Sequence, residues 1–229
     1  MPHTDPLLIH TQFVLFFAQP IGKPEEFWKQ LQQTELGQVF NQTPLIQPVP
    51  MDHHSMEIPV VQIGSSQGHA LSIARMRADI MFLVPHGPDS DANPHPLFQS
   101  FFKLFEEQTL VRRVGYVKRW FITDNEPVKR IGALLAYNPE DRQGGTLQEV
   151  FIRYTTRQAI YQYDCNNFTN IEPATVNASN ADTMTGILVT KDINTIPEQN
   201  YLFDADTLKT FFTEADILTT AATIQNLVA

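Results

Sequence analysis

The sequence predicts an α+β fold of two similar β-α-β-β-(β)-α halves, which form a curved, mainly antiparallel sheet with helices packed on one face. Two observations indicate this fold. Residues 116–135 repeat the pattern of residues 13–31, because each stretch runs from an aromatic strand through a polar turn into the first turn of a helix. The segments around Phe101-Phe102 and Phe211-Phe212 then occupy matching places further along.

This repeat places residues 1–110 in a first half and residues 111–229 in a second. Of the 229 residues, 42% are hydrophobic, so the chain can bury a core as one large domain or as two small packed ones. We expect one compact unit with an internal duplication. Convergent patterning of two ordinary α+β halves would give the same order of elements.

The first half opens with a predicted strand over residues 7–18, which are rich in apolar, aromatic and β-branched side chains. Pro24 and the glutamates after it suit the first turn of a helix, and Gly37 marks its expected end. Residues 41–59 hold four prolines and predict an extended connection, because proline neither donates into a sheet nor continues a helix.

A hairpin and a helix complete the first half. Residues 59–64 and 70–84 read as two strands around a Ser-Ser-Gln-Gly-His turn. Apolar residues alternate with charged ones over most of the second strand, which indicates one buried face. The phenylalanines between residues 97 and 105 recur at helical spacing and predict a core helix.

The second half offers the same parts. The predicted elements are a strand at 114–122, a helix at 127–137, a linker at 138–145, a hairpin of 147–155 and 158–164, a strand at 183–192 and a helix at 204–220. The hairpin turn is expected at Thr156-Arg157. Either Asp204 or Asp206 can cap the last long helix, and residues 221–228 extend or follow it.

Charge and cysteine content limit the classes of function. A net charge of −9 disfavours generic binding to nucleic acid or to anionic membranes, which needs a concentrated cationic surface. The single cysteine, Cys165, excludes an internal disulfide framework. No signal-peptide pattern is present and no apolar run approaches the ~20 residues that cross a bilayer, so we expect a cytoplasmic protein with no membrane partner.

The sequence contains no familiar catalytic motif. Nucleophile elbows and glycine-rich phosphate loops are absent, and Cys165 has no local signature of a nucleophile, so a structural thiol is the simpler interpretation. His53 and His54 are the candidate metal ligands, but adjacent histidines in a proline-rich linker point in different directions. We therefore expect no cofactor and no metal site. Whether the chain is an enzyme stays open, and the missing motifs favour the answer no.

One local stretch reverses the acidic balance of the chain. The candidate binding residues are Arg112, Arg113, Lys118, Arg119 and Trp120. Such a mixture of basic and aromatic side chains can bind phosphate, nucleic acid or an acidic protein. The simpler interpretation is that the charged residues of a strand face solvent while the neighbouring apolar and aromatic residues pack inward.

A second group of residues carries negative charge near the C-terminal strand. Its members are Asp182, Asp192, Glu198, Asp204 and Asp206. Carboxylates of this kind can hold magnesium, but capping of the last helix and solvation of a loop explain them more simply.

Two short segments resemble a known group of proteins. Leu110-Val111-Arg112-Arg113-Val114-Gly115-Tyr116, followed by the stretch from Gly186 to Thr195, is similar to a group of sporadically distributed bacterial conserved-hypothetical proteins of similar length. The likeness covers most of the chain in the order of elements. It implies no catalytic residues.

Two functions are therefore expected. The first is a soluble, non-catalytic binding or interaction protein of bacterial type, which associates with a protein partner or with itself as a subunit of an oligomer. The alternative is a metal- or phosphate-dependent enzyme that uses the His53/His54 region or the Arg112/Arg113 region. The alternative requires those side chains to converge in one pocket.

Overall fold

The computed structural model describes residues 5–48, 56–83, 95–106, 109–135, 147–177, 183–199 and 201–229. The first half contains β1 (Leu7–Phe17), α1 (Pro24–Leu31), α2 (Glu35–Val39), β2 (Leu45–Ile46), β3 (Val61–Gly64), β4 (Ala70–Ile73), β5 (Arg77–Leu83) and α3 (His95–Glu106). The second contains β6 (Val111–Thr123), α4 (Pro127–Leu134), β7 (Ile152–Ile160), β8 (Tyr163–Asn177), β9 (Thr183–Thr195), α5 (Ala205–Ile217) and α6 (Ala221–Leu227).

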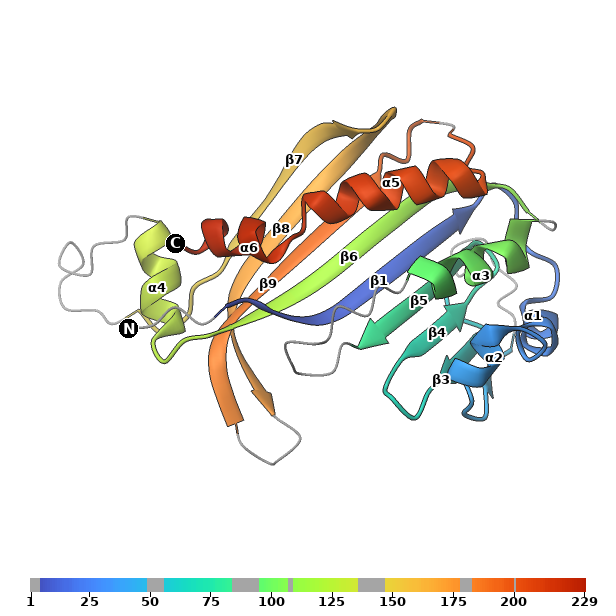
Figure 1. The fold of residues 1–229 in the computed structure, drawn as a ribbon, viewed down its shortest axis with the longest axis horizontal. Helices are drawn as coiled ribbons and strands as arrows, with labels where there is room; N and C mark the ends of the chain where they lie inside the picture. The colour runs from blue at the N-terminus through green and yellow to red at the C-terminus, as the bar shows by residue number, and fades with distance from the viewer. Residues whose placement is uncertain are drawn as a thin grey trace.

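All nine strands of the described part belong to one open antiparallel sheet, in the order β2-β3-β4-β5-β1-β6-β9-β8-β7. The predicted α+β class with an antiparallel sheet is confirmed. β1 and β6, the first strands of the two halves, lie side by side at the centre (Figure 1). On each side the remaining strands run outward to an edge, so the order of strands in one half mirrors that in the other, apart from the additional β2.

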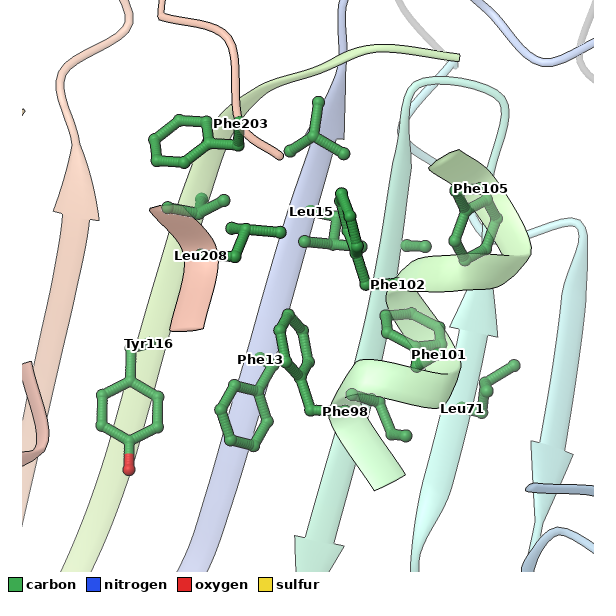
Figure 2. Packing of buried hydrophobic residues seen from close by; sticks show 14 of the residues in the cluster. Phe13, Leu15, Leu71, Phe98, Phe101, Phe102, Phe105, Tyr116, Phe203 and Leu208 are labelled. Atoms are coloured by element: carbon green, nitrogen blue, oxygen red, sulfur yellow. The ribbon is translucent and has the colours of Figure 1, made fainter. Parts of the chain in front are cut away.

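Helices cover one face of this sheet, which we call the helix face. α3 and α5 cross it and pack on a large cluster of buried side chains (Figures 1 and 2). Phe13 of β1 lies at its centre, with ring centroids 4.6 Å from Phe98 of α3 and 5.0 Å from Phe212 of α5. The two predicted halves therefore share one core.

A second, smaller cluster lies beneath α4 and α6. Ile131 of α4 and Ile224 of α6 pack there against Trp120, Ile122 and Val189 of the sheet. Burial of these apolar side chains holds the C-terminal helix on the sheet, because the removal of apolar surface from water is the main favourable contribution to folding. The opposite face of the sheet, which we call the open face, carries no helix among the described residues.

The prediction of a single helix from Pro24 to Gly37 is wrong, because the structure has two helices there: α1 ends at Leu31 and α2 begins at Glu35. The Thr34 hydroxyl donates a hydrogen bond of 2.8 Å to the carbonyl of Leu31 in the intervening turn. Gly37 lies within α2, where a Cβ atom would come 2.7 Å from the Cα of Gln32. The glycine therefore permits two short helices to approach closely.

The strand expected over residues 70–84 is also interrupted. It forms β4 and β5, which are joined by a tight turn in which the Ala74 amide donates to the Arg77 carbonyl over 2.7 Å. The alternation of apolar residues changes phase at Ile73-Ala74, where two apolar residues stand next to each other. That phase change is the local sign of the turn.

The hairpin turn expected at Thr156-Arg157 is wrong as well. β7 runs through both residues, and the turn lies at Tyr161-Gln162, where Tyr161 has a φ of 54°. β8 then extends over 15 residues, although it contains Pro173 and several asparagines. Pairing with a partner on each side overrides the weak strand propensity of these residues.

Other predictions are confirmed or fall outside the described residues. Asp204 caps α5, because its carboxylate accepts a hydrogen bond of 2.8 Å from the Thr207 amide. The helix expected over 204–220 ends at Ile217, and α6 follows as a separate helix. Residues 49–55 of the proline-rich connection and the linker expected at 138–145 lie outside the described residues.

Candidate functional site

The residues of β6 divide between the two faces of the sheet with a period of two. Tyr116, Lys118 and Trp120 are buried on the helix face. Arg113 and Arg119 line a hollow on the open face. The five candidate binding residues are therefore not brought together, since side chains that follow one another along a strand point to opposite faces.

Arg112 belongs to neither group. It lies at a shift in register between β6 and β1, is exposed and does not line the hollow. The interpretation in which charged residues face solvent and aromatic ones pack inward holds for Arg112, Arg119 and Trp120, whereas Lys118 is buried.

The hollow on the open face has a volume of about 580 Å³ and spans β5, β1, β6, β9, β8 and β7. Four arginines line it, against two carboxylates. The charged residues of its lining are Arg77, Arg113, Arg119, Arg153, Glu172 and Asp192. The hollow is therefore cationic on balance, although the chain as a whole carries a net charge of −9.

On the β5 side of the hollow the charges are paired within the protein. Arg77 makes two hydrogen bonds to Asp79, of 2.8 and 2.6 Å, and the Gln12 amide donates a third to the same carboxylate. The Phe16 ring lies between two guanidinium groups, with its centroid 5.3 Å from that of Arg77 and 4.4 Å from that of Arg113. These contacts hold the side chains in fixed positions.

The middle of the hollow is a hydrogen-bonded network. Arg113 donates to the Thr195 carbonyl over 3.0 Å and to the Asn194 side chain over 3.3 Å. Asn194 in turn donates to Asp192 over 3.1 Å. Burial raises the pKa of Asp192 and lowers that of Arg113, because it disfavours the charged form of each group.

The part of the hollow between β6 and β7 differs from the β5 side, because its two arginines are not paired with another described residue. Arg119 and Arg153 are both exposed, and neither donates a hydrogen bond to another described residue. They are joined in register by Thr190 and Asn170, which lie between them on β9 and β8. Three strand spacings separate the two backbones by about 14 Å. Two available guanidinium groups thus flank a polar floor.

A polar row, buried except at its β7 end, crosses the helix face at the same level. Its members are register partners on five adjacent strands: Thr11, Lys118, Lys191, Thr169 and Tyr154. Lys118 Nζ lies 2.5 Å from Asp216 Oδ1 of α5, and the Tyr116 hydroxyl donates to the same oxygen. The row separates the two apolar clusters.

Lys191 is the least compensated member of this row. Its Nζ donates to the Thr169 hydroxyl over 2.7 Å, and burial lowers its pKa to about 8. The Thr11 hydroxyl and the Trp120 indole nitrogen are buried without a hydrogen-bond partner in the described part of the chain. Such groups cost stability, because folding removes them from water without replacing its hydrogen bonds.

The candidate nucleophile and metal ligands do not form a site among the described residues. Cys165 is buried, as expected for a structural thiol, and burial raises its pKa to about 12. His53, His54 and Asp182 lie outside the described residues. The side chains that are described contain no group of three or more histidine, cysteine or acidic residues that could hold a metal ion.

Sequence reasoning missed several residues of the open face. It did not name Arg153, and it named Asp192 only as a member of the acidic group near the C-terminal strand. Both residues line the hollow beside Arg113 and Arg119, although they are 40 and 79 residues from Arg113 along the chain (153 − 113; 192 − 113). Only the strand order brings them together. His10 was also missed, and it faces Arg119 in register, where burial and the arginine charge lower its pKa to about 4.

Comparisons with known proteins add no family. No protein-family model matches the chain, and no curated protein is significantly similar to it. The resemblance to bacterial conserved-hypothetical proteins therefore stays a prediction. Within the described residues, none of the helices combines the length and the apolar character needed to cross a membrane.

Proposed function

We propose that the protein is a non-catalytic binding protein that holds an acidic segment of a protein partner on the open face of its sheet. The observation that carries this proposal is the pair of exposed guanidinium groups, Arg119 and Arg153, at the hollow of about 580 Å³. Neither guanidinium group donates a hydrogen bond to another described residue, so the donors of both are available to a ligand.

The geometry suits an elongated ligand with more than one carboxylate. Guanidinium groups bind carboxylates in a two-pronged geometry, and charge-assisted hydrogen bonds of this type are the strongest that side chains make. Asn170 and Thr190 offer further polar contacts between the two arginines. Because the paired charges near Arg77 are already compensated, we expect the ligand to lie on the β7 side of the hollow.

The phosphate-dependent enzyme considered as an alternative has less support. It requires Arg112 and Arg113 to converge in one pocket, but only Arg113 lines the hollow. The guanidinium of Arg113 is already engaged by Asn194 and the Thr195 carbonyl. Two of its five N–H donors are therefore already used within the protein.

Further parts of the proposal rest on the architecture and composition. The mirrored strand order about β1 and β6, together with the matching Phe101-Phe102 and Phe211-Phe212 segments, supports an internal duplication. Association with a protein partner, or with a further copy as a subunit of an oligomer, and a cytoplasmic location belong to the same proposal.

The test measures binding of fluorescent acidic peptides by anisotropy, with basic peptides of equal length as the comparison. Wild-type protein is expected to prefer the acidic peptides, and salt should weaken the binding. The double variant Arg119→Glu/Arg153→Glu should lose about tenfold or more in affinity, because two attractive charges become repulsive.

The matched control is Lys29→Glu/Lys209→Glu, which makes the same change in net charge on exposed residues of α1 and α5. It should bind as the wild type does, apart from a small long-range effect. The proposal fails if the control loses as much affinity as the open-face variant, or if wild-type protein binds basic peptides equally well.

A further inference from the structure

β7 leaves one edge of the sheet unpaired in the described part of the chain. It is the outermost strand, has nine residues without a proline, and is exposed from Arg153 to Arg157. The opposite edge strand, β2, has only two residues and stands between Pro44 and Pro48. Short strands and nearby prolines prevent further pairing, so β2 is a blunted edge and β7 is not.

The open-face side of β7 carries two cations in a regular arrangement. Arg153 lines the hollow, so Thr155 and Arg157 point to the same face. The nine residues of β7 include no carboxylate. Arg153 stacks on the Phe168 ring of β8 at 5.1 Å, which leaves its N–H groups available, and Arg157 donates no hydrogen bond to another described residue.

We propose that β7 accepts an extended acidic segment of the partner as an additional strand, with carboxylates opposite Arg153 and Arg157. This rests on the proposed function and names how the partner is held. Backbone hydrogen bonds to the free edge supply affinity, and the two carboxylates, four residues apart on one side of the added strand, supply specificity. The body of the partner then lies over the hollow that Arg119 lines.

A second copy of this chain is a poorer occupant of the same edge. Symmetric antiparallel pairing of two β7 strands about Thr155 would place each Arg153 opposite the Arg157 of the other copy. Like charges directly opposite one another destabilise a strand pair, whereas opposite charges stabilise it. The charge pattern therefore favours an acidic strand over self-pairing.

The other side of β7 offers an apolar contact to the same strand. Tyr154 points toward the helix face and is 39% exposed. An apolar residue of the added strand, placed between the two acidic positions and on the opposite side, would cover part of the Tyr154 ring. We therefore expect an apolar residue to improve binding at that position.

The experiment uses the full chain and a synthetic peptide of about nine alternating valines and threonines, with two glutamates four residues apart. Hydrogen exchange followed by NMR should show new protection at alternate backbone amides of β7. A peptide with lysines in place of the glutamates should bind about tenfold more weakly. Arg153→Glu/Arg157→Glu should reverse that preference, which keeps the test independent of any loss of folding.

Methylation of alternate peptide nitrogens separates this inference from the proposed function. Methylation of either the odd-numbered or the even-numbered nitrogens removes the backbone donors along one edge of the peptide but leaves the glutamates in place. One of these two peptides, the one methylated on the edge that faces β7, should bind about tenfold more weakly. If neither methylation weakens binding while Arg119→Glu/Arg153→Glu does, strand addition is overturned and the proposed function stands. Protection, without peptide, of the β7 amides that point away from β8 would identify a second copy as the occupant and overturn the acidic partner.

Discussion

Lys118 and Arg119 are neighbours on β6, yet they lie in two rows of side chains that differ in burial and in the pairing of their charges. On the helix face, Lys118 and Lys191 are buried beneath α5, and Asp216 compensates one of them. On the open face, Arg119 and Arg153 are exposed and form no ion pair or hydrogen bond with another described residue. The type of residue therefore does not decide the role of a charge. A basic side chain that is buried under a helix and paired with a carboxylate contributes to stability, whereas an exposed and unpaired one can bind a partner.

Of the changes considered, removal of the Asp216 carboxylate should have the largest effect on stability. Asp216→Asn leaves Lys118 buried without its counter-ion, so we expect unfolding in urea to require about 2–3 kcal/mol less free energy than in the wild type. The value stays below that of a fully buried pair because the Asp216 side chain is 41% exposed. Asp206→Asn makes the same chemical change on an exposed residue of α5 and should cost far less. Equal losses for the two variants would contradict the structural role of the pair.

Lys191→Met should have the opposite sign. A buried ammonium group held by one hydroxyl costs free energy, so its replacement by an apolar side chain of similar length should stabilise the fold by about 1–2 kcal/mol at pH 7. Thermal and urea unfolding measure this gain. A loss of stability would show that Lys191 has a compensating partner.

The pH dependence of the Lys191→Met gain provides its control. The folded-state pKa of about 8 lies below the ordinary 10.5, so the unfolded chain binds more protons between these values and the wild type regains stability as the pH rises. The advantage of the variant should therefore be complete below pH 8 and shrink toward pH 10.5. A constant advantage across this range would argue against titration of Lys191.

Thr11→Val should give a smaller gain. The Thr11 hydroxyl is buried without a partner in the described part of the chain, and valine has nearly the same shape, so we expect stabilisation of about 0.5–1 kcal/mol. Thr169→Val is the matched control in the same row, and it should destabilise because it removes the hydrogen bond that Lys191 donates. The same sign for both threonines would show that their hydrogen bonding does not distinguish them.

Arg119→Ala and Arg153→Ala should change stability least, by no more than about 0.5 kcal/mol, because both side chains are exposed and make no hydrogen bond to another described residue. Peptide binding should fall in both variants. Melting temperature and anisotropy on the same samples test the two statements together. A large loss of stability would assign these arginines to the fold and count against the open face as a binding surface.

Part of this comparison could be predicted from the sequence. The period of two along β6 predicts that Lys118 and Arg119 point to opposite faces, and the composition predicts an α+β fold. Local patterns cannot show which strand lies beside β6. The relation of Arg119 to Arg153 depends on the pairs Arg119–Thr190, Thr190–Asn170 and Asn170–Arg153, whose members are 71, 20 and 17 residues apart (190 − 119; 190 − 170; 170 − 153).

Two errors show where local reasoning fails. Thr156-Arg157 looks like a turn because polar residues cluster there, but β7 continues through it as an edge strand whose side chains are solvated on both faces. β8 contains asparagines and a proline that disfavour strands in isolation, and its pairing with β7 and β9 decides the outcome. The alternation of apolar and polar residues that marks a strand is weakest in a strand that buries few side chains.

The central position of β1 also has a consequence for how the chain folds. β1 precedes both of its partners along the chain, and they are distant: His10 pairs with Leu83, and Leu8 pairs with Trp120. Loops of about 73 and 112 residues (83 − 10; 120 − 8) must close before this apolar strand is covered on both sides. High contact order slows folding to milliseconds or longer in small domains. During synthesis, this central strand can therefore pair with β5 only after residue 83 has emerged, and one of its edges stays open until residue 120 has followed.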